Sequence, residues 1–276
     1  MKLLLTGIFT MALAAAVVVG AEIPWSTPTA VRYIDEGAVS AALAKGGVLL
    51  QDPGLVIAAE RRSTPSAAAS SATTNQFFLV REGEATLVMG GTLAGAAIEG
   101  GRTRRLKAGD MMVVPAKTPY WWRDVPAGGI AYLAIKRETP RSGNTWGLPD
   151  VVQYISAARL TAQMSDVGGS GEPLLVDPGV VSFAQRKFKD DEPEIHPNHS
   201  HIFVLMDGEA TFLTGEHGAP IVKGKAVGAT KLHQIRRGGI MIVPSTTPHQ
   251  WVSITGNKFG PKDAIGYIAI NMDDPR

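Results

Sequence analysis

Histidine is the residue of this sequence best suited to chemistry, and all six histidines lie in the second half of the chain. Four of them have the spacing of a site: three fall within six residues, and the fourth follows Pro248. Residues two apart on a strand point to the same face, so His199 and His201 can share one side of a sheet, and His196 can fold in beside them. Neutral imidazoles are common ligands for borderline divalent metals, and three of them leave coordination positions open for water or substrate. The pattern predicts one divalent metal ion per chain, and the ligands are drawn from His196, His199, His201 and His249. Which three or four of them bind stays open.

The remaining polar residues near this cluster are interpreted as ordinary. His217 lies in a Gly/Glu loop, and we expect it and His233 to be surface or core histidines. Asp191, Glu192 and Glu194 could supply a base. An acidic run before a strand is usually a solvated loop, however, and we expect that role for them.

An internal duplication supplies the elements that position the histidines. Residues 49–56 (LLQDPGLV) recur as residues 174–181 (LLVDPGVV), and the same offset of 125 relates residues 83–86 to 208–211, both GEAT. Beyond a four-residue insertion, residues 130–135 (IAYLAI) recur as 265–270 (IGYIAI). We therefore predict two homologous domains, residues 30–137 and 151–276, and a Pro/Gly/Ser-rich linker at residues 138–150.

The apolar segments of both copies are short, rich in branched and aromatic residues, and bounded by Gly, Pro, Asp and Asn. Such segments are typical of strands, so an all-β sandwich or barrel is expected, with helices only near residues 38–44 and 156–164. The first copy lacks the histidines, because the aligned residues are Ser71, Thr74, Gln76 and Tyr120. The first domain is therefore predicted to be metal-free. As a hypothesis, Gln76 and Tyr120 could hydrogen-bond an organic ligand.

Two stretches of the second copy resemble the motifs of a known family. HPNHSHIFVLMDG (196–208), followed about thirty residues later by GGIMIVPSTTPH (238–249), is similar to the two cupin motifs. His201 stands seven residues before Gly208, where cupins usually carry glutamate, and His249 stands at the position of the last cupin histidine. The upstream spacing H-x2-H-x-H departs from the usual pattern. The chain is identified as a bicupin with a degenerate first domain: two tandem double-stranded β-helix (jelly-roll) barrels, of which the second binds metal.

The resemblance implies a function as well as a fold. Cupin centres of this kind typically hold iron, and sometimes nickel, copper, manganese or zinc, and the sequence does not distinguish these metals. The expected activity is dioxygenase-type oxidation of a small organic substrate. The alternatives are a non-catalytic protein that binds a small molecule, a sugar or a metal, a metal-dependent isomerase, lyase or hydrolase, and a structural protein, so whether the chain is an enzyme stays open. Cupins often pair barrels, so a homodimer is also compatible.

The N-terminus and the composition bear on where the protein works. Lys2, an apolar run at residues 3–19, and small residues at the −3 and −1 positions (Val19 and Ala21) predict a signal peptide at residues 1–21. An uncleaved anchor is the alternative. We expect a periplasmic or secreted protein that has no membrane contact after cleavage. A net charge of +2 with scattered basic residues argues against a nucleic-acid partner, and the absence of cysteine excludes disulfides and thiolate ligands.

Overall fold

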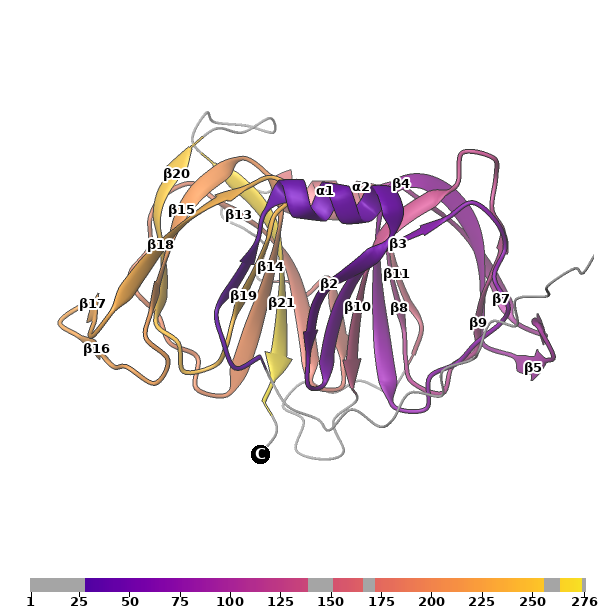
Figure 1. Ribbon diagram of the computed structural model, residues 1–276, viewed down its shortest axis with the longest axis horizontal. Coiled ribbons are helices and arrows are strands. Elements are labelled where there is room, and N and C mark those ends of the chain that lie inside the picture. The colour runs from indigo at the N-terminus through magenta and orange to yellow at the C-terminus, as the bar shows by residue number, and fades with distance from the viewer. Residues whose placement is uncertain (1–27, 139–150, 166–171, 256–263, 275–276) are drawn as a thin grey trace, which may run out of the picture.

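Two antiparallel β-barrels lie side by side in the computed structural model, which describes residues 28–138, 151–165, 172–255 and 264–274 (Figure 1). The predicted signal peptide and all but the first residue of the predicted linker lie outside these residues. Within them, no helix has the length and apolar character needed to cross a membrane.

The first barrel is built around one long strand, β4 (Thr74–Met89), that belongs to two sheets. Its first half pairs with β8 and β10, and its second half pairs with β7 and β9. The other strands of the described barrel are β2 (Gly47–Asp52), β3 (Leu55–Arg62), β7 (Arg102–Lys107), β8 (Met111–Val114), β9 (Tyr120–Asp124) and β10 (Ile130–Glu138), with a small hairpin of β5 (Thr92–Ala94) and β6 (Ala97–Glu99).

The second barrel repeats this arrangement, but the counterpart of β4 is divided into β14 (His199–Asp207) and β15 (Glu209–Gly215). Gly208 separates the two strands at a φ of 76°, and Gly83 occupies the same place within β4 at a φ of 66°. Glycine adopts this left-handed conformation readily, which explains why both copies have a glycine at the start of the GEAT motif. The remaining strands are β12 (Leu175–Asp177), β13 (Val180–Lys187), β16 (Ile221–Val222), β17 (Lys225–Ala226), β18 (Thr230–Arg236), β19 (Ile240–Val243), β20 (His249–Thr255) and β21 (Ile265–Asp273).

Each repeat donates its first strand to the barrel of the other repeat. Strand β1 (Arg32–Ile34), at the start of the first repeat, pairs with β19 of the second barrel, and β11 (Gln153–Ile155) pairs with β8 of the first. Each donated strand leads into a helix, α1 (Glu36–Lys45) or α2 (Ala157–Ser165), so the helices expected near residues 38–44 and 156–164 are confirmed. The two helices lie above the junction of the barrels (Figure 1). The exchange interlocks the two repeats.

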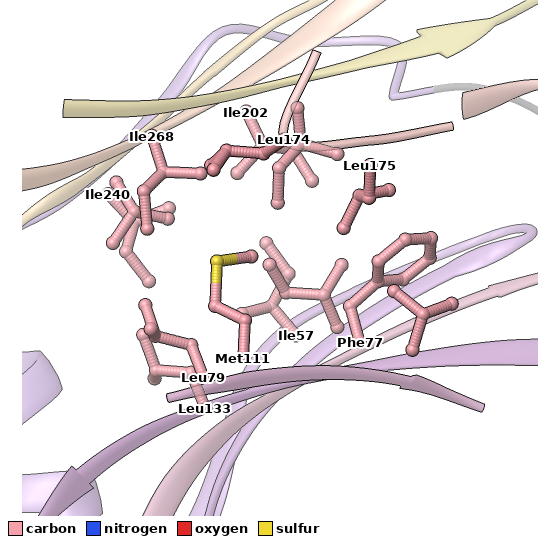
Figure 2. Packing of buried hydrophobic residues seen from close by; sticks show 14 of the residues in the cluster. Ile57, Phe77, Leu79, Met111, Leu133, Leu174, Leu175, Ile202, Ile240 and Ile268 are labelled. Carbon is pink, nitrogen blue, oxygen red and sulfur yellow. The ribbon is translucent and has the colours of Figure 1, made fainter. Parts of the chain in front are cut away.

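The largest apolar cluster lies between the two barrels (Figure 2). Leu79 and Leu133 of the first barrel and Ile202 and Ile268 of the second are fully or almost fully buried in it. Alternate residues of the same strands point the other way, into the barrel, as Tyr132 does. The sheets that meet at the junction are therefore buried on both faces, which accounts for unbroken apolar runs such as AYLAI and IMIV.

Candidate metal centre

The four predicted histidines enter the second barrel from two strand ends. His199 and His201 are the first and third residues of β14, and His249 is the first residue of β20. The segment before β14, which carries His196, is held by backbone hydrogen bonds to the start of β20. The amide of His249 donates to the carbonyl of Glu194 at 3.0 Å, and the amide of Glu194 donates to the carbonyl of His249 at 2.9 Å. This bridge fixes Glu194, and His196 two residues further on, beside the start of β20.

The structure brings the four imidazoles together. The ring centroid of His196 lies 4.6 Å from those of His199 and His201 and 5.4 Å from that of His249. Potential ligand atoms lie within 4.8 Å of one another in two overlapping groups, one of His196, His199 and His201, the other of Glu194, His196 and His249. The cluster is thus four imidazoles and one carboxylate, with His196 common to both groups.

The hydrogen-bond partners of the two most buried histidines determine which ring nitrogen carries the proton. Nδ1 of His201 lies 2.8 Å from the side-chain oxygen of Asn271, and Nδ1 of His249 lies 2.9 Å from the backbone carbonyl of Thr247. Both partners are acceptors, so the proton of each neutral imidazole is on Nδ1. The Nε2 atom of each ring therefore carries a lone pair that can bind a metal. Both Nε2 atoms are buried and have no hydrogen-bond partner. Because buried polar atoms are normally satisfied, two unpaired lone pairs facing one cluster fit a bound cation.

Glu194 strengthens this fit. Its Oε1 lies 3.3 Å from Nε2 of His249, and its Oε2 lies 3.5 Å from Nε2 of His196. A carboxylate oxygen facing an imidazole lone pair at such a distance is repulsive unless a proton or a metal ion lies between them. Burial acts to raise the pKa of Glu194, whereas its contacts with His196 and His249, with a proton or cation between the carboxylate and the imidazoles, outweigh burial and hold the pKa well below the usual range. The carboxyl group is therefore charged at neutral pH.

Aromatic side chains form the inner wall of the site. The ring of Phe203 stacks on His201 with centroids 5.2 Å apart, and Phe212 stacks on His249 at 5.8 Å. Burial first, and the neighbouring histidines second, lower the pKa of His199 to about 4 and hold the pKa of His201 well below its usual value. These two imidazoles are neutral at physiological pH, which is the form that binds metals.

The outer wall is open to solvent. The side chain of Glu194 is 47% exposed and that of His196 is 29% exposed, whereas His249 is 1% exposed. A small molecule can therefore approach from the side of Glu194 and His196, while Phe203 and Phe212 close the inner side.

The remaining polar residues of the second copy have other roles. Nε2 of His233 lies 2.9 Å from the hydroxyl of Thr214, and Nδ1 of His217 lies 3.3 Å from that of Thr247, so both histidines lie outside the cluster. Asp191 is structural, since it accepts the amide of Trp251 at 2.8 Å.

Two residues of the site differ from the sequence-based expectation. Glu194 is exposed, as expected for a loop residue, but the backbone bridge to His249 also brings its carboxylate to the edge of the cluster, which was not expected. Asn271 was not identified at all. It lies opposite His201 in the β14–β21 pairing, 70 residues away in the sequence, so only knowledge of that pairing could have revealed it.

The equivalent place in the first barrel has a different chemistry. Gln76 pairs with Val114 as His201 pairs with Val243, and the hydroxyl of Tyr120 donates to Oε1 of Gln76 at 3.2 Å. Lys136, opposite Gln76, takes the position of Asn271. Among the described residues, every group of three or more potential metal ligands lies in the second barrel.

No protein-family model and no curated protein matches the sequence. Similar solved structures exist. Salicylate 1,2-dioxygenase from Pseudaminobacter salicylatoxidans is 10% identical, with a TM-score of 0.61 over 96% of this chain and 90% of its own. A variant of that enzyme in complex with gentisate is 9% identical, with a TM-score of 0.60 over 88% of this chain and 82% of its own. A variant of oxalate decarboxylase from Bacillus subtilis is 12% identical, with a TM-score of 0.50 over 93% of this chain and 80% of its own. At such identities the likeness is one of fold: the chain shares with these proteins an all-β fold of two tandem cupin-type (jelly-roll) barrels.

Proposed function

We propose that the second barrel binds one divalent metal ion and uses it for dioxygenase-type oxidation of a small organic substrate. The ligands are drawn from His196, His199, His201 and His249, with Glu194 as a further ligand or as the group that holds a proton. The observation that carries the proposal is the pair of buried, unpaired Nε2 atoms on His201 and His249. The fold that the chain shares with salicylate 1,2-dioxygenase supports this chemistry.

A divalent ion on neutral imidazoles keeps most of its charge, so when bound it supplies Lewis acidity toward substrate oxygens and, if it is redox-active, electron transfer. The chain's own residues do the rest. Asn271 holds the ring of His201 in the tautomer that binds. Phe203 and Phe212 exclude water from the inner side, which strengthens every charge interaction in the site. Glu194 is charged and half-exposed, so its Oε1 can accept a proton from a substrate hydroxyl at the open side.

The first barrel, in this proposal, carries no metal. In the first barrel, Gln76 and Tyr120 stand at the positions of His201 and His249. Lys136 stands at the position of Asn271, and Ala69 stands at that of Glu194. The proposal also includes export. The signal pattern at residues 1–21 supports a mature chain that begins near residue 22 and works in the periplasm or outside the cell, with no membrane or nucleic-acid partner.

The test is metal content per chain, measured by elemental analysis on three proteins. We expect about one ion per chain in the wild type and none in His199→Ala/His249→Ala. The matched control, His217→Ala/His233→Ala, removes the same number of imidazoles outside the cluster and is expected to keep the ion. Loss of metal from the control alone, or no metal in the wild type after reloading, would refute the site. Oxygen consumption with enol or phenol substrates then tests the activity. Stoichiometric zinc without turnover would favour a binding protein instead.

A further inference from the structure

A half-enclosed pocket opens at the seam of the first barrel, away from the histidine cluster. It has a volume of about 450 Å³ and lies between β7, at the edge of its sheet, and β11, the strand donated by the second repeat. This volume is in the range of small-molecule sites. The residues that matter for its chemistry are Met89, Arg102, Arg104, Met112, Val152 and Tyr154.

Two solvent-exposed arginines of β7 lie on the core-facing side of that strand. Side chains alternate along a strand, and Leu106 of the same strand is buried in the barrel core, so Arg102 and Arg104 lie on the core-facing side. The register agrees, because Arg102 is paired with Met89, another core residue. The guanidinium of Arg104 lies 4.3 Å from the ring centroid of Tyr154, which fixes its position at the pocket.

Neither guanidinium pairs with an acidic residue in the part of the chain that the structure describes. Within the described residues, Arg102 and Arg104 make no ion pair and no hydrogen bond through their side chains. Arg105, on the opposite face of the same strand, pairs with Glu84, and Arg62 pairs with Glu60 at 3.1 Å. Among the described residues, the pocket therefore presents two guanidiniums that form no ion pair, above an apolar floor of Met89 and Met112, which are 5% and 1% exposed.

The corresponding region of the second barrel differs, so the pocket is not a simple consequence of the fold. His233 stands at the position of Arg104, is 7% exposed, and bonds the hydroxyl of Thr214, the counterpart of Met89. Tyr33, the counterpart of Tyr154, donates a hydrogen bond to Glu36 at 3.2 Å instead of contacting a guanidinium. The second barrel thus keeps a positive charge, Lys231, at the position of Arg102, but a hydrogen-bonded histidine replaces Arg104.

We propose that this pocket binds a small organic carboxylate with an apolar body. The planar guanidinium matches a carboxylate in a two-point hydrogen bond, and two of them favour an anion over any neutral ligand. The apolar body lies against Met89, Met112 and Val152, and the thioethers of the two methionines suit an aromatic ring. Such a ligand contacts β7 of the first repeat and β11 of the second at once.

The test compares benzoate with benzamide, its neutral isostere, by titration calorimetry on the full chain at low salt. We expect benzoate to bind at least ~10-fold more tightly than benzamide, because charge-assisted bonds to two guanidiniums are lost in the amide. The preference should disappear in Arg102→Gln/Arg104→Gln. It should persist in Arg105→Gln, which removes a guanidinium from the other face of the same strand, and in His199→Ala/His249→Ala, which removes the histidine cluster.

Four outcomes would overturn the proposal. Equal binding of benzoate and benzamide by the wild type refutes it without any variant. A loss in Arg105→Gln as large as that in the double variant indicates general surface charge. A loss in the histidine variant assigns the binding to the metal centre. Tighter binding of inorganic phosphate than of benzoate would show that the apolar floor contributes nothing.

Discussion

Removing the side-chain oxygen of Asn271 should weaken metal binding without removing a ligand. In the wild type, Nδ1 of His201 donates to that oxygen at 2.8 Å, and His201 is 5% exposed. With Leu at position 271, the buried N–H has no acceptor. The metal-free ring can relax by rotating or by moving its proton to Nε2, but the metal-bound ring cannot, so the cost falls on the bound state.

The size of the effect follows from this geometry. An unsatisfied buried donor costs about 1–3 kcal/mol, and outer partners of metal-binding histidines typically change affinity by about 10–100-fold, or about 1.4–2.7 kcal/mol. We therefore expect Asn271→Leu to raise the dissociation constant for Zn²⁺ by about 10–100-fold. Asn271→Asp keeps an acceptor oxygen at the same place and should bind at least as tightly as the wild type.

The assay is competition for Zn²⁺ against a chromophoric chelator at neutral pH, on wild type, Asn271→Leu and Asn271→Asp. Circular dichroism of the metal-free proteins checks that the fold is retained. Two results would refute the reasoning: an unchanged affinity in Asn271→Leu, or an equal loss in Asn271→Asp, which would mean that side-chain shape rather than the hydrogen bond matters.

Three further predictions concern stability, and urea unfolding checks each. Ile202→Ala, in the cluster between the barrels, should lower the free energy of unfolding by about 2–5 kcal/mol, and no loss would contradict a packed interface. Burial acts to raise the pKa of Glu60, but Lys136 and its other partners lower it below 4.5, so its stabilisation is present at neutral pH and lost as the pH falls below that value. The stability gap between wild type and Glu60→Gln should therefore narrow in acid, and a constant gap would contradict this. Gly83 and Gly90 have similar positive φ values of 66° and 72°, but only at Gly83 would a Cβ meet a backbone carbonyl. Gly90→Ala should cost about 1–2 kcal/mol and Gly83→Ala about 1–3 kcal/mol more, and equal costs would contradict the clash.

Much of the fold was predictable because it follows from local patterns in the sequence. The repeated segments, such as GEAT with its glycine of positive φ, and the short apolar runs indicated two similar all-β units, and the structure has two barrels. The exchange of β1 and β11 was not predicted. Each is a three-residue strand, and nothing in three residues distinguishes pairing within a repeat from pairing across repeats. That choice depends on which sheet edge is left open once both barrels are packed.

The candidate site likewise has features that the sequence predicted and features that only the tertiary structure shows. The spacing of His199 and His201 placed both imidazoles on one face, because the side-chain period of a strand is two residues. The sequence also separated His217 and His233 from the cluster, since they lack that spacing. It could not place Glu194, because a polar loop has no apolar face to fix its direction, and the bridge to His249 decided it. Nor could it identify Asn271, because an antiparallel register is set by packing across the whole sheet and brings together residues far apart in the chain.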